Sequence, residues 1–207
     1  MVLLLLAVVV AACRSGAGGS PAIIQPGPPG QAGRVIGASE ATDLSKVQAT
    51  AADVRFMQGM IGHHAQAIEM VALLKTRSTW EDMQKLGLRI EVSQEDEIRM
   101  MQRWLEVRGQ TLPDPHAHHK AGAHLMPGML TADEMARLGA AKGAEFDRLF
   151  LEGMIKHHGG ALSMVEELFA SPGAGQESDI YAFASDVVAD QRMEMDRMAA
   201  MLRELQK

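Results

Sequence analysis

Cysteine is almost absent from this chain of 207 residues, and the one residue of this type is Cys13, near the N-terminus. A single cysteine allows no intrachain disulfide and no thiolate cluster, so any bound metal must be held by histidine, methionine or carboxylate side chains. The sequence has no block of Lys and Arg and carries a formal net charge of -6. Both features argue against nucleic acid as a partner.

Aromatic residues are also scarce, at 4% of the chain. Few residues are β-branched, and no segment of useful length alternates polar with apolar residues, so strands are not expected. Several enzyme motifs are missing: a nucleophile triad, a glycine loop that holds phosphate and the His-Glu-x-x-His motif of zinc proteases. The sequence predicts an all-α protein without enzymatic activity.

The N-terminus contains an unbroken apolar run, residues 3–12, that ends at Cys13. The run is too short to span a bilayer, which takes roughly 20 apolar residues, and it is typical of a lipoprotein signal peptide over residues 1–13, with Cys13 as the lipidated residue. A plain cleaved signal and a short anchor helix are the alternatives. No Lys or Arg precedes the run, which leaves open a start codon further upstream. We expect a lipoprotein anchored to a membrane, in the periplasm or at the cell surface.

Residues 14–38 are rich in Gly, Pro, Ser and Ala and carry almost no charge. Such a composition cannot bury enough apolar area to fold, so a disordered tether is expected there. Residues 39–207 remain for one folded domain, and about 170 residues suffice for a real core.

The most informative feature of this domain is an internal duplication. Residues 56–64 return as residues 150–158, so that a Met-x-x-His-His unit occurs twice, and residues 93–101 correspond to residues 190–198. Two copies of such length favour a closed bundle over a solenoid array. The expected units are repeat 1 at about 45–109, a linker at 110–130 and repeat 2 at about 131–207.

Apolar residues recur at helical spacing through both repeats. Short turns join the long helices in pairs, so each pair should form an antiparallel hairpin, and the two hairpins a four-helix bundle. The segments expected to be helical are residues 50–76, 79–109, 131–143, 144–170 and 176–206.

The duplicated unit has the composition of a metal site. Consecutive helical residues point about 100° apart, so His63 and His64 cannot chelate one ion as a simple pair and need other partners. Met60 lies one turn earlier, on the same patch as both rings. The residues expected to bind the metal are Met60, His63, His64, Met70, Met154, His157, His158 and Met164.

Carboxylates are expected near these histidines. In an antiparallel hairpin, Gln94 and Glu97 come level with His63, and the duplication places Gln191 and Glu194 at the same height. Such groups orient imidazole ligands. The residues expected to act in this way are Asp53, Glu97, Asp147 and Glu194.

Thioether and imidazole ligands without thiolate suit soft ions, so Cu(I) is the favoured ion, with Ag(I) or Zn(II) as alternatives. Two other interpretations stay open. The first is a di-metal enzyme that uses histidine and carboxylates, and the second is a structural bundle whose His and Met residues only pack. The expected partner is the metal ion, and a metal-transfer protein or a homo-oligomer stays open.

The linker offers another candidate site, because it holds four of the eight histidines in a Gly- and Pro-containing context. Such a segment can wrap an exposed Cu(II) or Zn(II) ion, and a solvated loop without a metal is the equal alternative. The residues expected to form this loop site are His116, His118, His119, His124, Met126 and Met129.

Over nearly all of residues 45–207 the chain resembles a bacterial family, the domain of unknown function DUF305. The pattern Asp-x-x-Phe-x-x-x-Met-Ile-x-His-His-x-x-Ala occurs twice in that family, and residues 53–67 and 147–161 fit it. Segments that begin at Gln94 and Gln191 and the Met-Pro-Gly-Met stretch at 126–129 also fit.

The resemblance implies a ferritin-like four-helix bundle. It also implies copper or silver binding outside the cytoplasm, because some members of the family do this and support copper resistance. The Glu-x-x-His pairs of a di-iron carboxylate centre are missing from this chain, which argues against ferritin-type oxidase chemistry.

Overall fold

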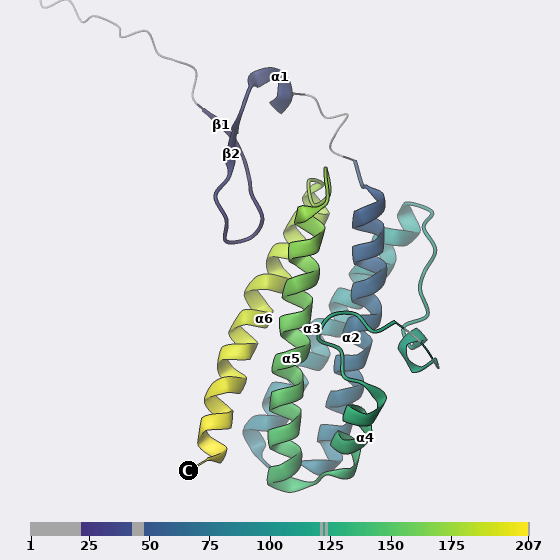
Figure 1. Cartoon of the computed structure of the whole chain (residues 1–207), viewed down its shortest axis with the longest axis vertical. Helices are drawn as coiled ribbons and strands as arrows, with labels where there is room; N and C mark the ends of the chain where they lie inside the picture. Colours follow the sequence, from purple (N-terminus) through teal and green to yellow (C-terminus); the bar gives the residue numbers. More distant parts are fainter. Residues whose placement is uncertain (1–21, 43–47, 121, 123, 207) are drawn as a thin grey trace, which may run out of the picture.

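The computed structural model describes residues 22–42, 48–120, 122 and 124–206. Its main body is a bundle of four long helices, α2 (Ala51–Arg77), α3 (Glu81–Val107), α5 (Gly143–Ala170) and α6 (Ser178–Leu205) (Figure 1). The expected all-α, ferritin-like bundle of two helical hairpins is confirmed, and each long helix begins and ends within about three residues of the expected position.

Local sequence signals explain where two of the helices begin. Thr50 caps α2, because its hydroxyl accepts from the backbone N–H of Asp53 while the Asp53 carboxylate accepts from the backbone N–H of Thr50. The short helix α4 (Ala132–Ala140) begins with the same arrangement between Thr131 and Glu134. The helix start is therefore encoded by residues three positions apart.

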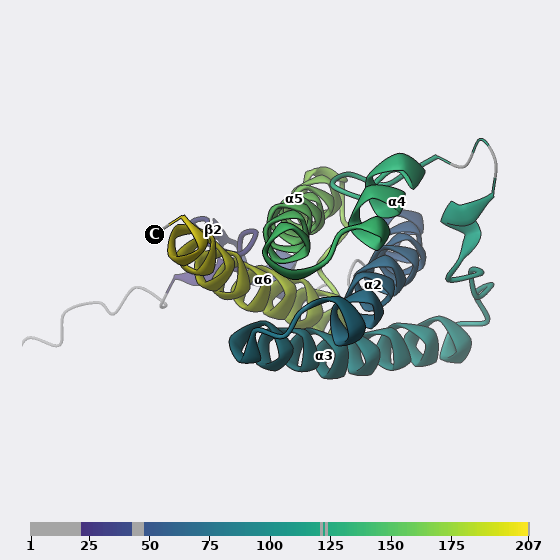
Figure 2. The same ribbon diagram turned by 90° about the horizontal axis from the view of Figure 1, so that it is seen from below.

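The two hairpins, α2 with α3 and α5 with α6, meet mainly where α2 packs against α5 (Figure 2). These two helices run antiparallel, so the middle of one faces the middle of the other. Two apolar clusters fill the bundle, one towards each end. The first includes Phe56, Trp104 and Phe183, and the second includes Leu74 and Phe146.

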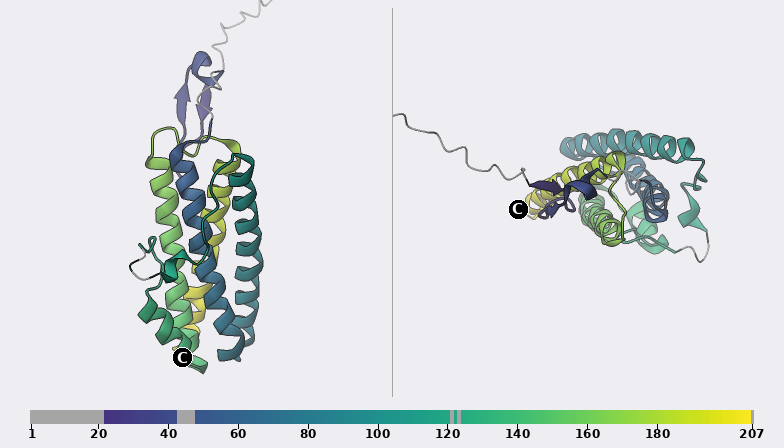
Figure 3. Two further views of the ribbon diagram at one scale, coloured as in Figure 1. Left: turned by 90° about the vertical axis from the view of Figure 1, so that its right-hand side faces the viewer. Right: turned by 90° about the horizontal axis from the view of Figure 1, so that it is seen from above.

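The linker from α3 to α4 runs along the outside of the bundle, beside α2 and α5 (Figure 3). Gln66, a buried residue of α2, holds it through two hydrogen bonds: its amide donates to the carbonyl of Leu130 (2.9 Å) and accepts from that residue's N–H (2.7 Å). The linker also lies directly on α5, since a Cβ atom on Gly160 would come within 1.9 Å of the Pro127 carbonyl oxygen. Glycine at this position permits the close approach.

One part of the chain departs from the expectation that strands are absent. A small antiparallel hairpin joins β1 (Ile23–Gln25) to β2 (Arg34–Ile36), and the four-residue helix α1 (Ala38–Ala41) follows. Both strands belong to residues 14–38, the segment expected to be a disordered tether. Two β-branched residues in β1 and two in β2 favour extended backbone, and the Pro- and Gly-rich segment between them accommodates the reversal.

The expected signal peptide, including Cys13, lies outside the described residues. Within the described part of the chain, no helix combines the length and the apolar character that crossing a membrane requires.

Candidate metal centre

A belt of polar side chains crosses the bundle between its two apolar clusters. The four histidines of the duplicated unit are completely buried, and two glutamines of the partner helices, Gln94 and Gln191, are nearly so. Buried polar groups in an apolar interior need partners, since an unpaired one costs about 1–3 kcal/mol. The members of the belt are His63, His64, Gln94, Glu97, His157, His158, Gln191 and Glu194.

The first histidine of each copy meets its counterpart at the centre of the belt. The rings of His63 on α2 and His157 on α5 are 3.8 Å apart between centroids, with an angle of 38° between their planes. Because α2 and α5 are antiparallel and equivalent, these rings lie next to the axis that relates the two copies. The duplication therefore creates one shared centre at the helix interface.

The second histidine of each copy points to the partner helix of its own hairpin. Nε2 of His64 lies 2.5 Å from a Glu97 carboxylate oxygen, and Nε2 of His158 lies 2.7 Å from a Glu194 carboxylate oxygen. Both glutamates were expected to orient imidazoles, and they have the positions that this role requires. Arg89 adds a bond to Glu194 at 3.3 Å.

These hydrogen bonds determine which ring nitrogen stays available. Nε2 of His63 is 3.0 Å from the carbonyl oxygen of Pro127, which can only accept, so the ring proton sits on Nε2. A neutral ring then has an unprotonated Nδ1 with a free lone pair. A carboxylate acceptor assigns the same tautomer to neutral His64 and His158.

Five of the eight ring nitrogens in the belt are buried without a hydrogen-bond partner in the described structure. They comprise Nδ1 of His63, His64 and His158 and both nitrogens of His157. Groups of this kind are rare in folded proteins, and a bound ion would satisfy them.

Burial keeps the central rings uncharged. Desolvation lowers the pKa of His63 to about 3, with a further contribution from neighbouring His64. The pKa of His157 lies well below its usual range for the same reason, and His63 adds to the effect. Both rings are therefore neutral near pH 7 and can act as metal ligands without losing a proton.

The expected methionine ligands lie in the same interior. Met60, Met70 and Met154 are fully buried, and Met164 is 7% exposed. Two of them pack across the α2–α5 interface in an equivalent way. Met164 of α5 packs against Gly59 of α2, and Met70 of α2 packs against Gly153 of α5. In each case the methionine Cε atom would lie 3.3 Å from a Cβ atom placed on the glycine.

Asp53 and Asp147 do not orient the histidines, so this part of the sequence interpretation is wrong. Asp53 accepts from the N–H of Gly175 at 2.8 Å, besides capping α2. Burial raises the pKa of the Asp147 carboxyl, and Ser78, which follows α2, counteracts this shift. Each aspartate thus binds the interhelical turn of the other hairpin, at the ends of the bundle.

A cavity between the hairpins reaches one edge of the belt. This cavity of about 590 Å³ opens between α3 and α6, and Glu97 belongs to its lining. Four aspartates of the two helices line it too, together with two arginines: Asp96, Asp179, Asp186, Asp190, Arg103 and Arg108. Burial raises the pKa of Asp190, and neighbouring carboxylates, Glu97 among them, raise it further. Carboxylates therefore outnumber guanidinium groups in the cleft, beside the Glu97 partner of His64.

The loop candidates separate into two groups. His116, His118 and His119 gather around Glu69 of α2, a residue that sequence reasoning missed because nothing in its spacing relates it to the linker. His124 and Met126 instead line a cavity of about 340 Å³ that also includes Met164 and Glu167. Met129 is buried. The six loop residues therefore do not form one site.

The comparisons with known proteins agree with this arrangement. The sequence profile of the family described as Domain of unknown function (DUF305) matches residues 53–202. This chain belongs to the DUF305 family. No curated protein matches it.

Solved structures of DUF305 proteins share the fold. A DUF305 fragment from Deinococcus radiodurans is 31% identical, with a TM-score of 0.65 over 75% of this chain and 98% of the fragment. A DUF305 protein from Streptomyces coelicolor, described as secreted, is 28% identical, with a TM-score of 0.63 over 74% of this chain and 93% of its own.

A third similar structure is that of CopM with Cu(II) bound. It is 26% identical, with a TM-score of 0.61 over 73% of this chain and 96% of CopM. CopM has also been solved with Cu(I) and with silver bound. Metal binding is thus established for a protein of this fold.

Proposed function

We propose that this protein binds Cu(I), or Ag(I) in its place, at the histidine belt and thereby sequesters the metal. The observation that carries the proposal is the set of five buried, unpartnered imidazole nitrogens around the His63–His157 contact. A soft monovalent ion suits neutral imidazole and thioether ligands. The belt supplies the imidazoles, and buried methionines of the same helices supply thioethers. The copper and silver complexes of CopM support the same class of ion.

The ligand set argues for binding and against catalytic turnover, which we do not assign to this protein. Within the described residues, three His or carboxylate ligand atoms come within 4.8 Å of one another only at Glu69, His118 and His119. We therefore infer that methionines of α2 and α5 join the belt histidines to complete a coordination shell. We assign Met60, His63, His64 and their counterparts Met154, His157 and His158 as the inner ligands.

An anaerobic titration with Cu(I) against a chromophoric Cu(I) chelator tests the proposal. Two double variants are informative: H63Q/H157Q removes the central rings, and M60L/M154L removes the thioethers while conserving volume. Each should weaken Cu(I) binding at least tenfold. M57L is the matched control, because Met57 is equally buried on the same helix but lies outside the Met-x-x-His-His unit. Wild-type affinity in both double variants would reject the belt as the site.

We also propose that the protein works outside the cytoplasm, attached through a lipid on Cys13. The apolar run that ends at this residue supports the anchor, and the relative described as secreted supports the compartment. Membrane fractionation of cells expressing the wild type and C13A tests it. The wild type should sediment with membranes and C13A should not; equal partition of both would contradict the anchor.

A further inference from the structure

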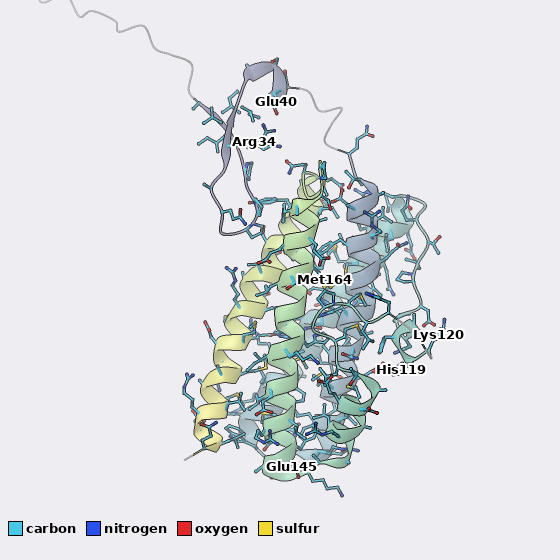
Figure 4. The ribbon with its side chains drawn as sticks, viewed as in Figure 1. Arg34, Glu40, His119, Lys120, Glu145 and Met164 are labelled. Carbon is cyan, nitrogen blue, oxygen red and sulfur yellow. The ribbon has the colours of Figure 1, made fainter. Side chains whose placement is uncertain are left out.

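Glu69 lies on the outward face of α2, where the linker passes over the helix. One of its carboxylate oxygens is 2.8 Å from Nδ1 of His116 and 2.8 Å from Nε2 of His119. The other is 3.4 Å from Nε2 of His118. Three imidazoles thus direct a nitrogen at one carboxylate. Figure 4 shows His119 of the linker beside the bundle, near Lys120.

The backbone of the linker prepares this arrangement. His116 to His119 form a tight turn, in which the N–H of His119 donates to the carbonyl of His116 (3.0 Å). The side chain of Asp114 accepts from the N–H of His116 (3.0 Å) and fixes the start of the turn. The rings of His118 and His119 are consequently only 4.3 Å apart. The histidines are held together by local structure.

Burial gives the cluster a closed and an open side. The side chain of His118 is 5% exposed and its Nδ1 is buried without a partner, whereas those of His116 and His119 are 62% and 58% exposed. Hydrogen bonds from the three histidines hold the pKa of Glu69 below its usual range. An ion could therefore reach an ionised carboxylate from solvent and rest against a fixed ring.

We propose that Glu69, His116, His118 and His119 form a second metal site, which takes a divalent cation of the Cu(II) or Zn(II) class. Three imidazoles and one carboxylate are ligands that both ions accept, and no sulfur is required. Ligand atoms of Glu69, His118 and His119 already lie within 4.8 Å of one another. The site differs from the belt in ligand type, in exposure and in the ion that it selects.

The duplication limits this site to one per chain. The position equivalent to Glu69 in the second copy is Ser163 on α5, which offers no carboxylate. The histidines themselves belong to the linker, which occurs once. A divalent ion bound here would also fasten the linker to α2, because its ligands come from both.

Titration of the full chain with Zn(II) against a chromophoric chelator measures the affinity and stoichiometry of the site. The wild type should bind one Zn(II) ion at this site. The E69Q and H119A variants should bind that ion at least tenfold more weakly. E166Q, which changes an exposed glutamate of α5, is the control and should match the wild type. With Cu(II), electron paramagnetic resonance should show nitrogen coupling in the wild type that is altered in H119A.

Two outcomes would overturn the proposal. The first is wild-type Zn(II) affinity in both E69Q and H119A. The second is a loss of Zn(II) affinity in H124A as large as that in H119A. This result would show that a flexible loop, and not the Glu69 cluster, holds the ion. The M60L/M154L variant separates the two sites, because it should lose Cu(I) affinity and keep Zn(II) affinity.

Discussion

His63 and His157 hold their rings 3.8 Å apart at the centre of the bundle, although 94 positions separate them in the chain. Each is the first histidine of its copy, and each is neutral because burial lowers its pKa. Two charged rings could not occupy this position. The contact therefore depends on neutral imidazoles, which are also the form that binds a metal.

The carboxylates behind His64 and His158 should tune the affinity of the belt. Changing Glu97 and Glu194 to Gln removes the acceptor charge that fixes the proton on Nε2 of each ring. We expect the double variant E97Q/E194Q to bind Cu(I) about 10- to 100-fold more weakly in competition titrations, as for other partners of metal-bound histidine. Unchanged affinity would mean that the second histidines are not ligands.

Helical periodicity and the duplication were sufficient to predict the fold. The repeat also predicted that Glu97 and Glu194 would come level with the histidines, because position along an antiparallel hairpin follows from sequence spacing. Gln66 and Glu69 could not be predicted as linker contacts. Their partners lie in an irregular segment whose path depends on tertiary packing.

The error over Asp53 and Asp147 has a geometric cause. Each aspartate is ten residues before the first histidine of its copy, which is about 15 Å along a helix. Sequence conservation between the copies indicated a shared role, and the structure shows that this role is to join the hairpins. A repeated residue can thus serve the repeat interface instead of the ligand site.

This correction predicts that D53A affects stability and leaves metal binding intact. The substitution removes the carboxylate half of the α2 capping box and the acceptor of the buried Gly175 N–H. We expect the free energy of unfolding in urea to fall by about 2–3 kcal/mol. The Cu(I) affinity of the folded variant should equal that of the wild type. A tenfold loss of affinity would show that Asp53 does support the metal site.

The lowered pKa values of His63 and His157 predict acid sensitivity of the metal-free protein. Between their folded pKa values and about 6.5, the unfolded chain binds protons that the folded protein does not, so stability falls as pH decreases through this window. Each ring contributes a slope of up to about 1.4 kcal/mol per pH unit. Urea denaturation at several pH values between 4 and 7, at ~0.5-unit steps, measures this slope. The H63Q/H157Q variant should show a smaller slope. An equally steep slope in that variant would mean that other groups cause the pH dependence.

The acidic cleft between α3 and α6 predicts an effect on the rate of metal uptake. Its aspartates attract cations towards Glu97, and attraction of this kind raises association rates in a manner that depends on ionic strength. The triple variant D96N/D186N/D190N should load Cu(I) about tenfold more slowly at low salt in stopped-flow measurements, with a smaller difference at high salt. An unchanged rate would mean that the metal enters elsewhere, such as beneath the linker.

The contact of the linker with α5 predicts opposite effects for substitutions at neighbouring glycines. G160A would place a Cβ 1.9 Å from the Pro127 carbonyl oxygen, the acceptor for His63, and displace the linker at a cost of about 1–3 kcal/mol. G159A is the control, because its Cβ meets nothing within 4 Å, and alanine in a helix should stabilise it by about 0.5–1 kcal/mol. Urea denaturation measures both changes. Hydrogen exchange should also speed up at Leu130 in G160A alone, since displacement of the linker releases that N–H from Gln66. If both variants have the same stability and the same exchange rate at Leu130, the position of the linker over His63 does not depend on this contact.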